Sequence, residues 1–455
     1  MPELEPGARA RKFSEVSLGY TAEMAVAEAR RCHQCRPSQA KCIPNCPLGI
    51  NIPKFVGHIA SGNFRAAYDS LSRDNLMPGT CGRICPQERQ CQTQCKAGIQ
   101  GDAIAIGHLE RFVGDWHIAR GKSVSSDPIP DHVPGVAVIG SGPAGLACAA
   151  DLARLRYSVT VFEPHPNAGG PLIQGTPEFR LPAEIVRAEV ENIRRMGVRF
   201  QYNAVPCGTF SLQNLLVEQD FRSIFLGLDE GTPRMPDIHG TGLKGIVSAD
   251  AFLAEFGRAS GGQAEEGPIA FERVVVAGGG DKALDCARTA LRLGASEVTI
   301  LYRRSLQELP ARRQWTEHVQ QEGIQFLFLS APVRLVGDEE NRLKRIECLE
   351  VELGEPDESG RARPVPKHGS EFQLAADMLV VAFGCDAGLL PAPWLSGLET
   401  DPHGRILVDP GTRQTSMRNV FAGRRIGGAS LTVAMGEGRA AARAIHRHIS
   451  LSAGL

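Results

Sequence analysis

Eight cysteines lie between Cys32 and Cys95, and their spacing constrains how the first quarter of this chain can fold. They form two runs, Cys32-x2-Cys35-x6-Cys42-x3-Cys46 and Cys81-x3-Cys85-x5-Cys91-x3-Cys95, and a proline follows Cys46 and Cys85. Thiolates at such short spacings can ligate iron–sulfur clusters, and a cysteine before a proline can serve a neighbouring cluster. By that logic Cys32, Cys35 and Cys42 hold one [4Fe–4S] cube and Cys46 reaches a second. The alternative is a pair of four-cysteine zinc sites, which leaves the nucleotide-binding motifs further along unexplained.

The rest of the composition is that of a globular protein. A length of 455 residues predicts two to four domains. The net charge of -1 gives no electrostatic reason to expect nucleic acid or an anionic membrane as a partner. No apolar stretch is long enough to span a bilayer, and the N-terminus has no secretory h-region. Thirteen cysteines without an export signal argue against disulfides, so we expect a cytoplasmic protein without a membrane span.

Apolar periodicity predicts short amphipathic helices over residues 52–71 and another over 104–116. We therefore expect residues 1–125 to form a helical domain around the metal centres. Prolines and serines predict a linker over 121–134, and the polar, glycine-rich stretch 260–267 predicts a surface loop.

A Gly-x-Gly-x-x-Gly fingerprint follows an apolar strand at residues 135–139 and precedes a small-residue helix. Such a loop places a pyrophosphate on the helix N-terminus, and an acid after the next strand bonds a ribose. Glu163 stands in that acidic position, although a solvated surface carboxylate is the alternative. The candidate ligands in the loop are Gly140, Gly142, Pro143, Ala144 and Gly145.

A second fingerprint follows the strand at 274–277 and has alanine in its third glycine position. Its candidate ligands are Gly278, Gly280, Asp281 and Lys282. After the next strand stand Arg303 and Arg304 in place of an acid, and guanidinium groups bind a 2′-phosphate as bidentate donors. This favours NADP(H), the alternative being a merely charged strand end. With a final strand, loop and helix over 420–446, the chain reads as α/β with two Rossmann-like domains.

The histidines are scattered, and no pair of a nucleophile and a base stands out. That agrees with hydride-transfer chemistry, which the cofactors carry while the protein aligns them.

Several motifs resemble one family, the NADPH-oxidising small (β) subunits of bacterial glutamate synthase. Its relatives include flavoprotein subunits of ferredoxin:NADP oxidoreductases and the N-terminal half of dihydropyrimidine dehydrogenase. The motifs are Arg31-Cys32-x2-Cys35, Cys46-Pro47-Leu48-Gly49-Ile50-Asn51-Ile52-Pro53, Cys81-Gly82-Arg83-Ile84-Cys85-Pro86, Ile106-Gly107-His108-Leu109-Glu110-Arg111-Phe112, Gly169-Gly170-Pro171-Leu172, Phe179-Arg180-Leu181-Pro182 and Tyr302-Arg303-Arg304.

The resemblance implies two interlaced [4Fe–4S] clusters, FAD on the first fingerprint and NADPH on the second. It implies a cysteine domain over 1–125, an FAD domain over 126–245 and 376–455, and an NADPH domain inserted at 246–375. The implied ligand sets are Cys32, Cys35, Cys42 and Cys95 for one cluster, and Cys46, Cys85, Cys91 and Glu110 for the other, with Cys81 idle. The implied neighbours of FAD further include Gly170, Leu172, Arg180, Leu431 and Thr432.

The chain departs from the family at three places. Six residues rather than four separate Cys35 from Cys42. Arg424 and Arg425 replace a glycine and the aspartate that bonds the FAD ribityl chain, which predicts weaker FAD binding by roughly 1–3 kcal/mol unless Arg425 turns to the pyrophosphate. A strand that usually ends in a Thr-Gly-like turn reads Gly227-Leu228-Asp229-Glu230.

The expected function is that of an electron-input subunit. NADPH reduces FAD, and electrons leave singly through the clusters to a larger catalytic subunit, most often that of a glutamate synthase, or to a ferredoxin-like acceptor. The alternatives are a ferredoxin:NADP or dihydropyrimidine dehydrogenase-type subunit, and a flavin-deficient assembly subunit suggested by Arg425.

Overall fold

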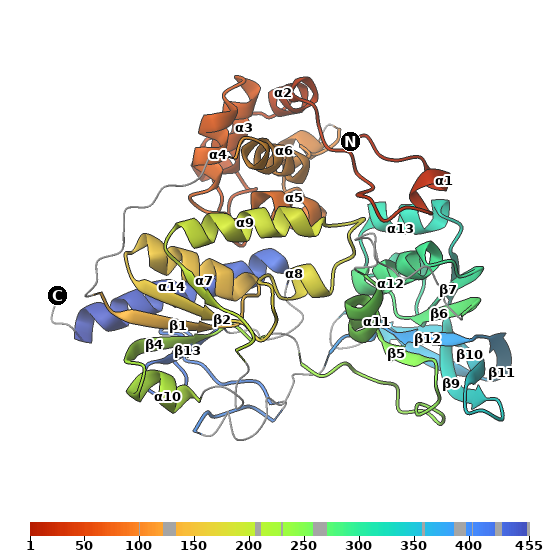
Figure 1. The fold of residues 1–455 in the computed structure, drawn as a ribbon. Coiled ribbons are helices and arrows are strands. Elements are labelled where there is room, and N and C mark those ends of the chain that lie inside the picture. The colour runs from red at the N-terminus through yellow and green to blue at the C-terminus, as the bar shows by residue number, and fades with distance from the viewer. Residues whose placement is uncertain are drawn as a thin grey trace.

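A computed structural model gives the fold of the chain. It describes residues 1–99, 101–121, 133–204, 211–228, 231–257, 271–356, 360–385, 397–402, 404–423 and 430–452. A group of short helices lies above two parallel sheets that stand side by side (Figure 1). Three parts of the chain discussed above lie outside the described residues: Arg424 with Arg425, the predicted loop 260–267, and most of the predicted linker.

The cysteine-bearing segment folds into short capped helices, which we call the cysteine unit. The α-helices are α2 (Ala22–Arg30), α3 (Ile52–Ala60), α4 (Phe64–Leu71), α5 (Pro78–Ile84) and α6 (Ile106–Ala119). The 3-10 turns are η1 (Pro37–Gln39), η2 (Gln87–Arg89) and η3 (Lys96–Ile99). Asn51 and Asn63 accept hydrogen bonds from backbone N–H groups of the first turns of α3 and α4, which fixes where these helices begin. The predicted helices are confirmed, with a break between α3 and α4.

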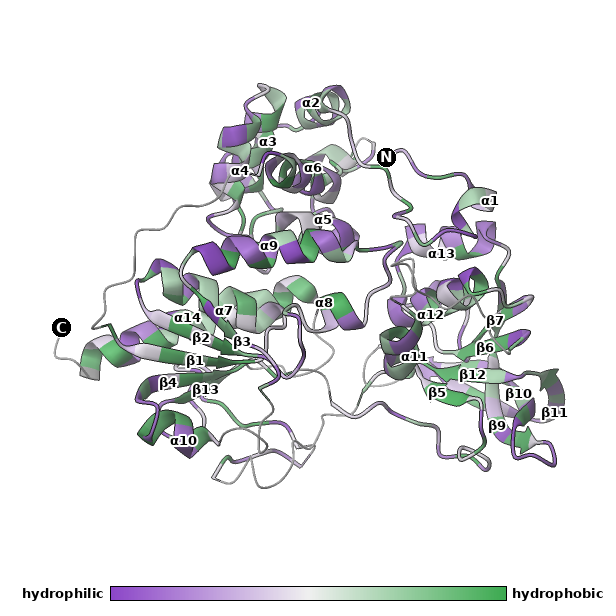
Figure 2. Cartoon of the chain, viewed as in Figure 1, coloured by the Kyte–Doolittle hydropathy of each residue, from purple (hydrophilic) through white to green (hydrophobic). Residues whose placement is uncertain are grey.

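The first sheet is wholly parallel, in the order β13-β4-β1-β2-β3. With its helices it forms what we call the first nucleotide unit. Its strands are β1 (Gly135–Ile139), β2 (Ser158–Phe162), β3 (Arg199–Gln201), β4 (Phe221–Leu226) and β13 (Val420–Ala422). Its helices are α7 (Pro143–Arg154), α8 (Pro171–Gln174), α9 (Ala183–Arg195), α10 (Leu212–Val217) and α14 (Leu431–Ser452). Figure 2 shows β1, β2 and β4 as hydrophobic, as strands covered on both faces must be.

The second sheet repeats this pattern in the order β5-β12-β6-β7-β8. Its strands are β5 (Ile246–Ser248), β6 (Arg273–Ala277), β7 (Glu297–Tyr302), β8 (Gln325–Phe328) and β12 (Met378–Val381). Its helices are α11 (Ala249–Phe256), α12 (Asp281–Arg292), the turn η4 (Leu306–Glu308) and α13 (Arg313–Gln321). This second nucleotide unit lies in sequence between β4 and β13 of the first, so the predicted insertion of one Rossmann-like fold into another is confirmed.

One predicted boundary needs correction. Strand β12 pairs with β5 and β6, so the inserted unit extends at least to Val381 and not to residue 375. An antiparallel sheet of β9 (Ser330–Gly337), β10 (Leu343–Pro356) and β11 (Ala362–Ala375) was not predicted. Strand β11 lies at its edge and contains Pro364 and Pro366, which a sheet accepts only at an edge or a bulge. Within the described ranges, no helix has the length and apolarity to cross a membrane.

The first 18 residues form an N-terminal arm that crosses the second nucleotide unit. Its helix α1 (Pro6–Arg9) lies beside α13 (Figure 1). Arg9 is only 2% exposed and pairs with Glu322, just past the end of α13, at 3.3 Å. At the other end of the arm, Glu15 pairs with Arg83 at 2.8 Å and Arg111 at 3.0 Å, both in the cysteine unit. The arm therefore connects two units through buried charges.

Candidate functional site

Two glycines of the first fingerprint are fixed by close backbone packing. Gly140 has a φ of +91°, and a Cβ there would lie 2.4 Å from the carbonyl oxygen of Gly227. A Cβ at Gly145 would lie 1.9 Å from the carbonyl oxygen of Gly140. Any side chain at either position would push the loop away from β4 or α7, so these glycines shape the turn itself.

Gly142 has a different reason to lack a side chain. A Cβ there would meet only Pro171 Cδ, at 3.9 Å, so the protein's own packing does not exclude one. Gly142 is the N-cap of α7, whose first turn begins with Pro143 and Ala144 and has unpaired N–H groups. Space next to a helix N-terminus is suited to a pyrophosphate. The residues thus fit a dinucleotide, as predicted for this loop.

Two further predicted residues lie beside this loop. Gly170 has a φ of +51°, and a Cβ there would lie 3.2 Å from Gly142 Cα. Leu172 is buried in α8 directly after it. The structure therefore brings the second glycine-rich turn against the first fingerprint.

Glu163 closes the same loop from the end of β2. It is 2% exposed, and its carboxylate accepts hydrogen bonds from Ser141 N and His165 N, each at 3.0 Å, and from the Ser141 hydroxyl. These bonds hold the glycine loop in place. A direct contact with ribose remains a prediction.

Arg180 points toward the second nucleotide unit. Its guanidinium hydrogen-bonds to Asp285 of α12, lies 3.7 Å from Asp281, and stacks 3.5 Å above the ring of Trp315. Its Nε is buried without a hydrogen-bond partner among the described residues. Arg180 thus connects the two nucleotide units, and its predicted proximity to FAD remains untested.

The second fingerprint has the same division between packing and open space. Gly278 has a φ of +143°, and a Cβ there would lie 2.5 Å from Ala382 O, whereas a Cβ at Gly280 would meet nothing within 4 Å. Gly280 caps α12, so open space again adjoins a helix N-terminus. Asp281 accepts from Arg312 N at 3.0 Å, and Lys282 pairs with Asp250 at 2.5 Å. Both side chains therefore already have partners within the protein, and a contact of either with a cofactor remains a prediction.

The two arginines after β7 differ in environment. Arg304 is buried and donates from Nε to Ala362 O, at the start of β11, at 2.7 Å. Arg303 is exposed at the strand end. Partial burial lowers the pKa of Arg303, and the charges of Arg304, Arg361 and Arg234 lower it further. Sequence analysis missed Arg361 and Arg234, because neither belongs to a glycine-rich fingerprint. Both add positive charge near Arg303, where a 2′-phosphate is predicted.

Four half-buried cysteines gather as the first predicted ligand set. Burial raises the pKa of Cys42 to about 11, and the negative charges of Cys95, Cys32 and Cys35 add to the effect. Such mutual influence requires the four thiols to be neighbours, although Cys95 comes from the second cysteine run. The structure thus brings together Cys32, Cys35, Cys42 and Cys95.

The second predicted set lies deeper. Cys85, Cys91 and Glu110 are 4%, 5% and 5% exposed. Burial raises the pKa of Cys85 to about 12, with the charges of Glu110 and Cys46 among the further causes. Burial also raises the pKa of Cys91, and the charges of Cys85, Glu110, Cys46 and Cys42 contribute. The last of these belongs to the first set, so the two sets are adjacent.

Glu110 is a buried carboxyl group with one described donor. Asn75 Nδ2 donates to its Oε1 at 2.6 Å, and burial raises the pKa of Glu110 to about 8. In the described ranges, no three His, Cys, Asp or Glu side chains are close enough together to chelate one metal ion. In a cube, each ligand binds a different iron, and this donor set of thiols with one carboxyl fits that arrangement.

Helix α14 lies against the second set. The Thr432 hydroxyl is 3.4 Å from Cys85 Sγ, and Met435 Sδ is 3.7 Å from Cys81 Sγ. A Cβ at Gly436 would lie 3.0 Å from Pro47 O. These positions, spaced three and four apart, share one helix face. The predicted segment Leu431–Thr432 is therefore in contact with the cysteine unit.

Sequence analysis also missed Arg312, the N-cap of α13. It is 7% exposed, its guanidinium carbon lies 3.9 Å from the Trp315 ring, and it pairs loosely with Glu88 at 3.7 Å. Burial lowers its pKa to about 10. Its Nε and Nη2 have no hydrogen-bond acceptor among the described residues. Two orphaned donors near the start of α12 fit an anionic group, and the run Arg312-Arg313 was the only trace of this in the sequence.

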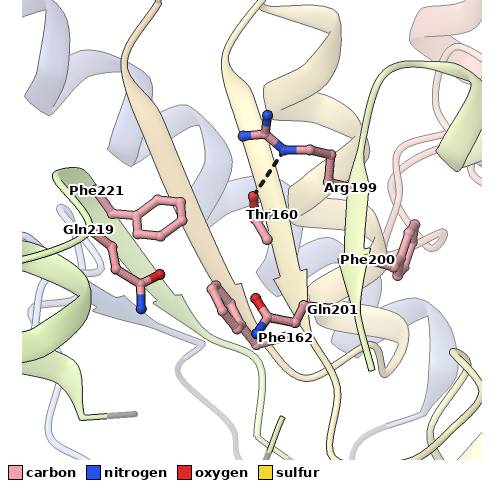
Figure 3. A pocket seen from close by; sticks show the side chains of 7 residues that line it. All are labelled: Thr160, Phe162, Arg199, Phe200, Gln201, Gln219 and Phe221. Atoms are coloured by element: carbon pink, nitrogen blue, oxygen red, sulfur yellow. Dashed lines mark hydrogen bonds between the residues drawn. The ribbon is translucent and has the colours of Figure 1, made fainter. Parts of the chain in front are cut away.

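A separate pocket of 330 Å³ lies along β2, β3 and the start of β4 in the first sheet (Figure 3). Its lining includes Thr160, Phe162 and Arg199, and the Arg199 guanidinium donates to the Thr160 hydroxyl at 3.4 Å. None of the predicted site residues lines it.

Comparison with known proteins gives two family matches. Residues 9–122 match the dihydropyrimidine dehydrogenase domain II family with a 4Fe–4S cluster. Residues 134–432 match the pyridine nucleotide–disulphide oxidoreductases.

Three individual proteins illustrate the similarity. The glutamate synthase [NADPH] small chain of Halomonas elongata is 35% identical over 98% of this chain and 95% of its own. The β subunit of the NADP(+)-dependent formate dehydrogenase of Moorella thermoacetica is 34% identical over 90% of this chain and 60% of its own. FprA of Mycobacterium tuberculosis, solved with NADPH, has a TM-score of 0.59 at 18% identity, covering 71% of this chain and 86% of its own. At that identity FprA supports the fold alone.

Proposed function

We propose that this chain, which belongs to the glutamate synthase small-chain family of NADPH-dependent oxidoreductases with FAD and [4Fe–4S] clusters, is the electron-input part of a larger assembly. Two observations support the cofactors in this chain independently of the family. Gly142 and Gly280 leave open space at two helix N-termini. The cysteine unit contains two neighbouring sets of thiols, one of them with Glu110.

When bound, NADPH supplies a hydride, FAD accepts it as an electron pair, and iron–sulfur clusters carry electrons one at a time. The protein's own residues orient these groups. Glu163 holds the first glycine loop, and Arg303 with its neighbouring cations fits the 2′-phosphate. The two thiol sets serve as ligands, as the family's pattern suggests. Arg180 and the orphaned donors of Arg312 fit anionic groups between the nucleotide units.

The observation that carries the proposed electron path is the contact of Thr432 with Cys85 at 3.4 Å. It supports a path in which electrons pass between the flavin, which we expect beside Leu431 and Thr432, and a cluster held by Cys85. The partner we propose is a larger catalytic subunit of the glutamate synthase type. A formate dehydrogenase-type assembly is the alternative, since a relative of that name has nearly the same identity.

The test is anaerobic reconstitution with iron, sulfide and FAD, followed by NADPH. We expect the flavin absorbance to bleach and an electron paramagnetic resonance (EPR) signal of reduced cubes to appear. A protein whose flavin stays oxidised would refute the proposal, and a metal analysis that finds zinc without acid-labile sulfide would refute the cluster assignment. Purification of the native complex with mass spectrometry of its subunits then distinguishes the two kinds of partner.

A further inference from the structure

The two ligand sets differ in their access to the surface. All four cysteines of the first set are half-exposed, as is Cys46 of the second, whereas the other members of the second set, Cys85, Cys91 and Glu110, are at most 5% exposed. The second set is the one that contacts α14. Because the sets adjoin one another, the first set connects the buried set to solvent.

The loops that carry the first set contain cations without acids. No aspartate or glutamate occurs in residues 29–68 or 89–101. Arg36 and Lys41 bracket the six-residue loop between Cys35 and Cys42, and Lys96 directly follows Cys95. All three are exposed, and none forms an ion pair with the part of the chain that the structure describes.

The nearest acids in the sequence do not neutralise these cations. Glu28 pairs with Arg31 at 2.8 Å and accepts from Ala105 N at 2.8 Å. Arg31 also donates to the backbone carbonyl of Asp102 at 2.6 Å, and the Asp102 charge acts on the same guanidinium. Beside Lys96, Ile99 at the end of η3 is 80% exposed. An exposed apolar side chain near exposed cations is a composition suited to a protein interface.

We propose that Arg36, Lys41, Lys96 and Ile99, which we call the exit face, dock a one-electron acceptor protein through an acidic surface around its redox centre. The proposal rests on the proposed function and adds to it the place and charge of the partner. A reduced cube held by the first set would supply one electron at a time to the oxidised centre of the docked acceptor, with no bond made or broken. Since the whole chain has a net charge of only -1, the attraction is local to this face.

Two soluble haem proteins of opposite charge provide the probes: cytochrome b5, which is acidic, and cytochrome c, which is basic. The reconstituted full chain is reduced with NADPH under anaerobic conditions, and second-order rates of haem reduction are measured over a range of ionic strength. We expect the rate with cytochrome b5 to fall steeply as salt increases, because screening weakens the attraction.

The variant is Arg36→Glu, Lys41→Glu and Lys96→Glu together. The matched control is Arg334→Glu, Arg342→Glu and Lys344→Glu, which makes the same change in net charge on exposed positions of the β9–β10 sheet. At low salt, the exit-face variant should reduce cytochrome b5 roughly tenfold more slowly than the control and cytochrome c faster. At high salt, the two variants should converge, which a misfolded exit face would not do.

The outcomes separate the two proposals. If NADPH yields no reduced-cube EPR signal in the wild-type protein, the proposed function fails. If the cubes are reduced but both variants give the same rates at low salt, the exit face is wrong. Binding of the wild-type protein to phosphatidylserine vesicles, with no effect of the substitutions on haem reduction, would assign the cations to a membrane surface and also overturn the proposal. If the triple variant loses iron, the single variants Arg36→Gln, Lys41→Gln and Lys96→Gln replace it. Each should then reduce cytochrome b5 more slowly at low salt, by a smaller factor.

Discussion

The Thr432 hydroxyl lies 3.4 Å from Cys85 Sγ, and the two side chains are 2% and 4% exposed. Both groups also bond Gln90 Oε1, each at 3.2 Å. A cysteine that ligates iron is a thiolate and can only accept, so Cys85 would no longer donate to Gln90 Oε1. We then expect the single proton of the Thr432 hydroxyl to turn from Gln90 Oε1 to the sulfur. Hydrogen bonds to ligand sulfur raise the reduction potential of a cluster, because they stabilise the added negative charge.

Replacing Thr432 by valine should therefore lower the potential of the second cluster. A hydrogen bond of about 1 kcal/mol corresponds to roughly 40 mV for one electron. EPR-monitored redox titration measures the shift, and rapid mixing with NADPH should show slower cluster reduction. Thr432→Ser keeps the hydroxyl and is the matched control. Equal potentials in the valine and serine variants would mean that this hydroxyl does not act on the cluster.

Glu110→Ala should halve the iron content, because the second cluster loses a ligand that we propose while the first keeps its four cysteines. The control is Cys81→Ala, which removes a thiol that lies 3.6 Å from Asn75 Oδ1 and 3.7 Å from Met435 Sδ in a buried site. If Cys81 is idle, that variant keeps its iron and acid-labile sulfide. Full iron in Glu110→Ala, or half in Cys81→Ala, would require a different ligand set.

Glu322 stabilises the N-terminal arm and the second nucleotide unit. It accepts from Arg292 at 2.8 Å and from Arg288 at 2.6 Å, and it pairs with Arg9. Burial opposes its ionisation, but the hydrogen bonds from these arginines dominate and lower its pKa from 4.5 to about 2. Removing one partner of such a buried network costs roughly 3–5 kcal/mol, which is the loss expected for Glu322→Gln at pH 7.

The sign of the pH dependence follows from the lowered pKa. The stabilisation by Glu322 is complete above about pH 4.5 and declines as the pH falls toward about 2. Urea midpoints should therefore differ strongly between wild type and Glu322→Gln at pH 7 and much less at pH 3. Glu317→Gln, at an exposed pair with Arg313, should change little at either pH. If the difference in urea midpoint stayed constant with pH, the carboxylate charge would not be the source of the stabilisation.

The sequence predicted the two Rossmann-like units well because their signals are local. A buried strand, a glycine turn and a helix follow one another within about 30 residues, and the turns at Gly140 and Gly278 have the positive φ that such motifs need. The gathering of Cys95 with Cys32 is a tertiary feature, and only the family resemblance implied it.

The N-terminal arm could not be predicted for a similar reason. Arg9 is buried in an ion pair with Glu322. The two residues lie more than 300 positions apart in sequence, and no local periodicity indicates such a pair. The antiparallel sheet of β9–β11 was missed because β11 has exposed residues on both faces and two prolines, a pattern that is also typical of a loop. Arg361 directly precedes β11, and it comes near Arg303 only because of where this sheet lies.

Arg303 and Arg361 should determine the preference for NADPH over NADH. The pKa of Arg303 is lowered first by partial burial and then by the charges of Arg304 and Arg361, so these cations lie near one another. A charged hydrogen bond to a 2′-phosphate contributes about 1.5–3 kcal/mol. Arg303→Ala should therefore raise the KM for NADPH roughly 10–100-fold and leave that for NADH nearly unchanged, with Arg361→Ala acting in the same direction. Steady-state reduction of ferricyanide measures both constants, and an equal rise for NADH would show that these arginines support the fold of the site and not the phosphate.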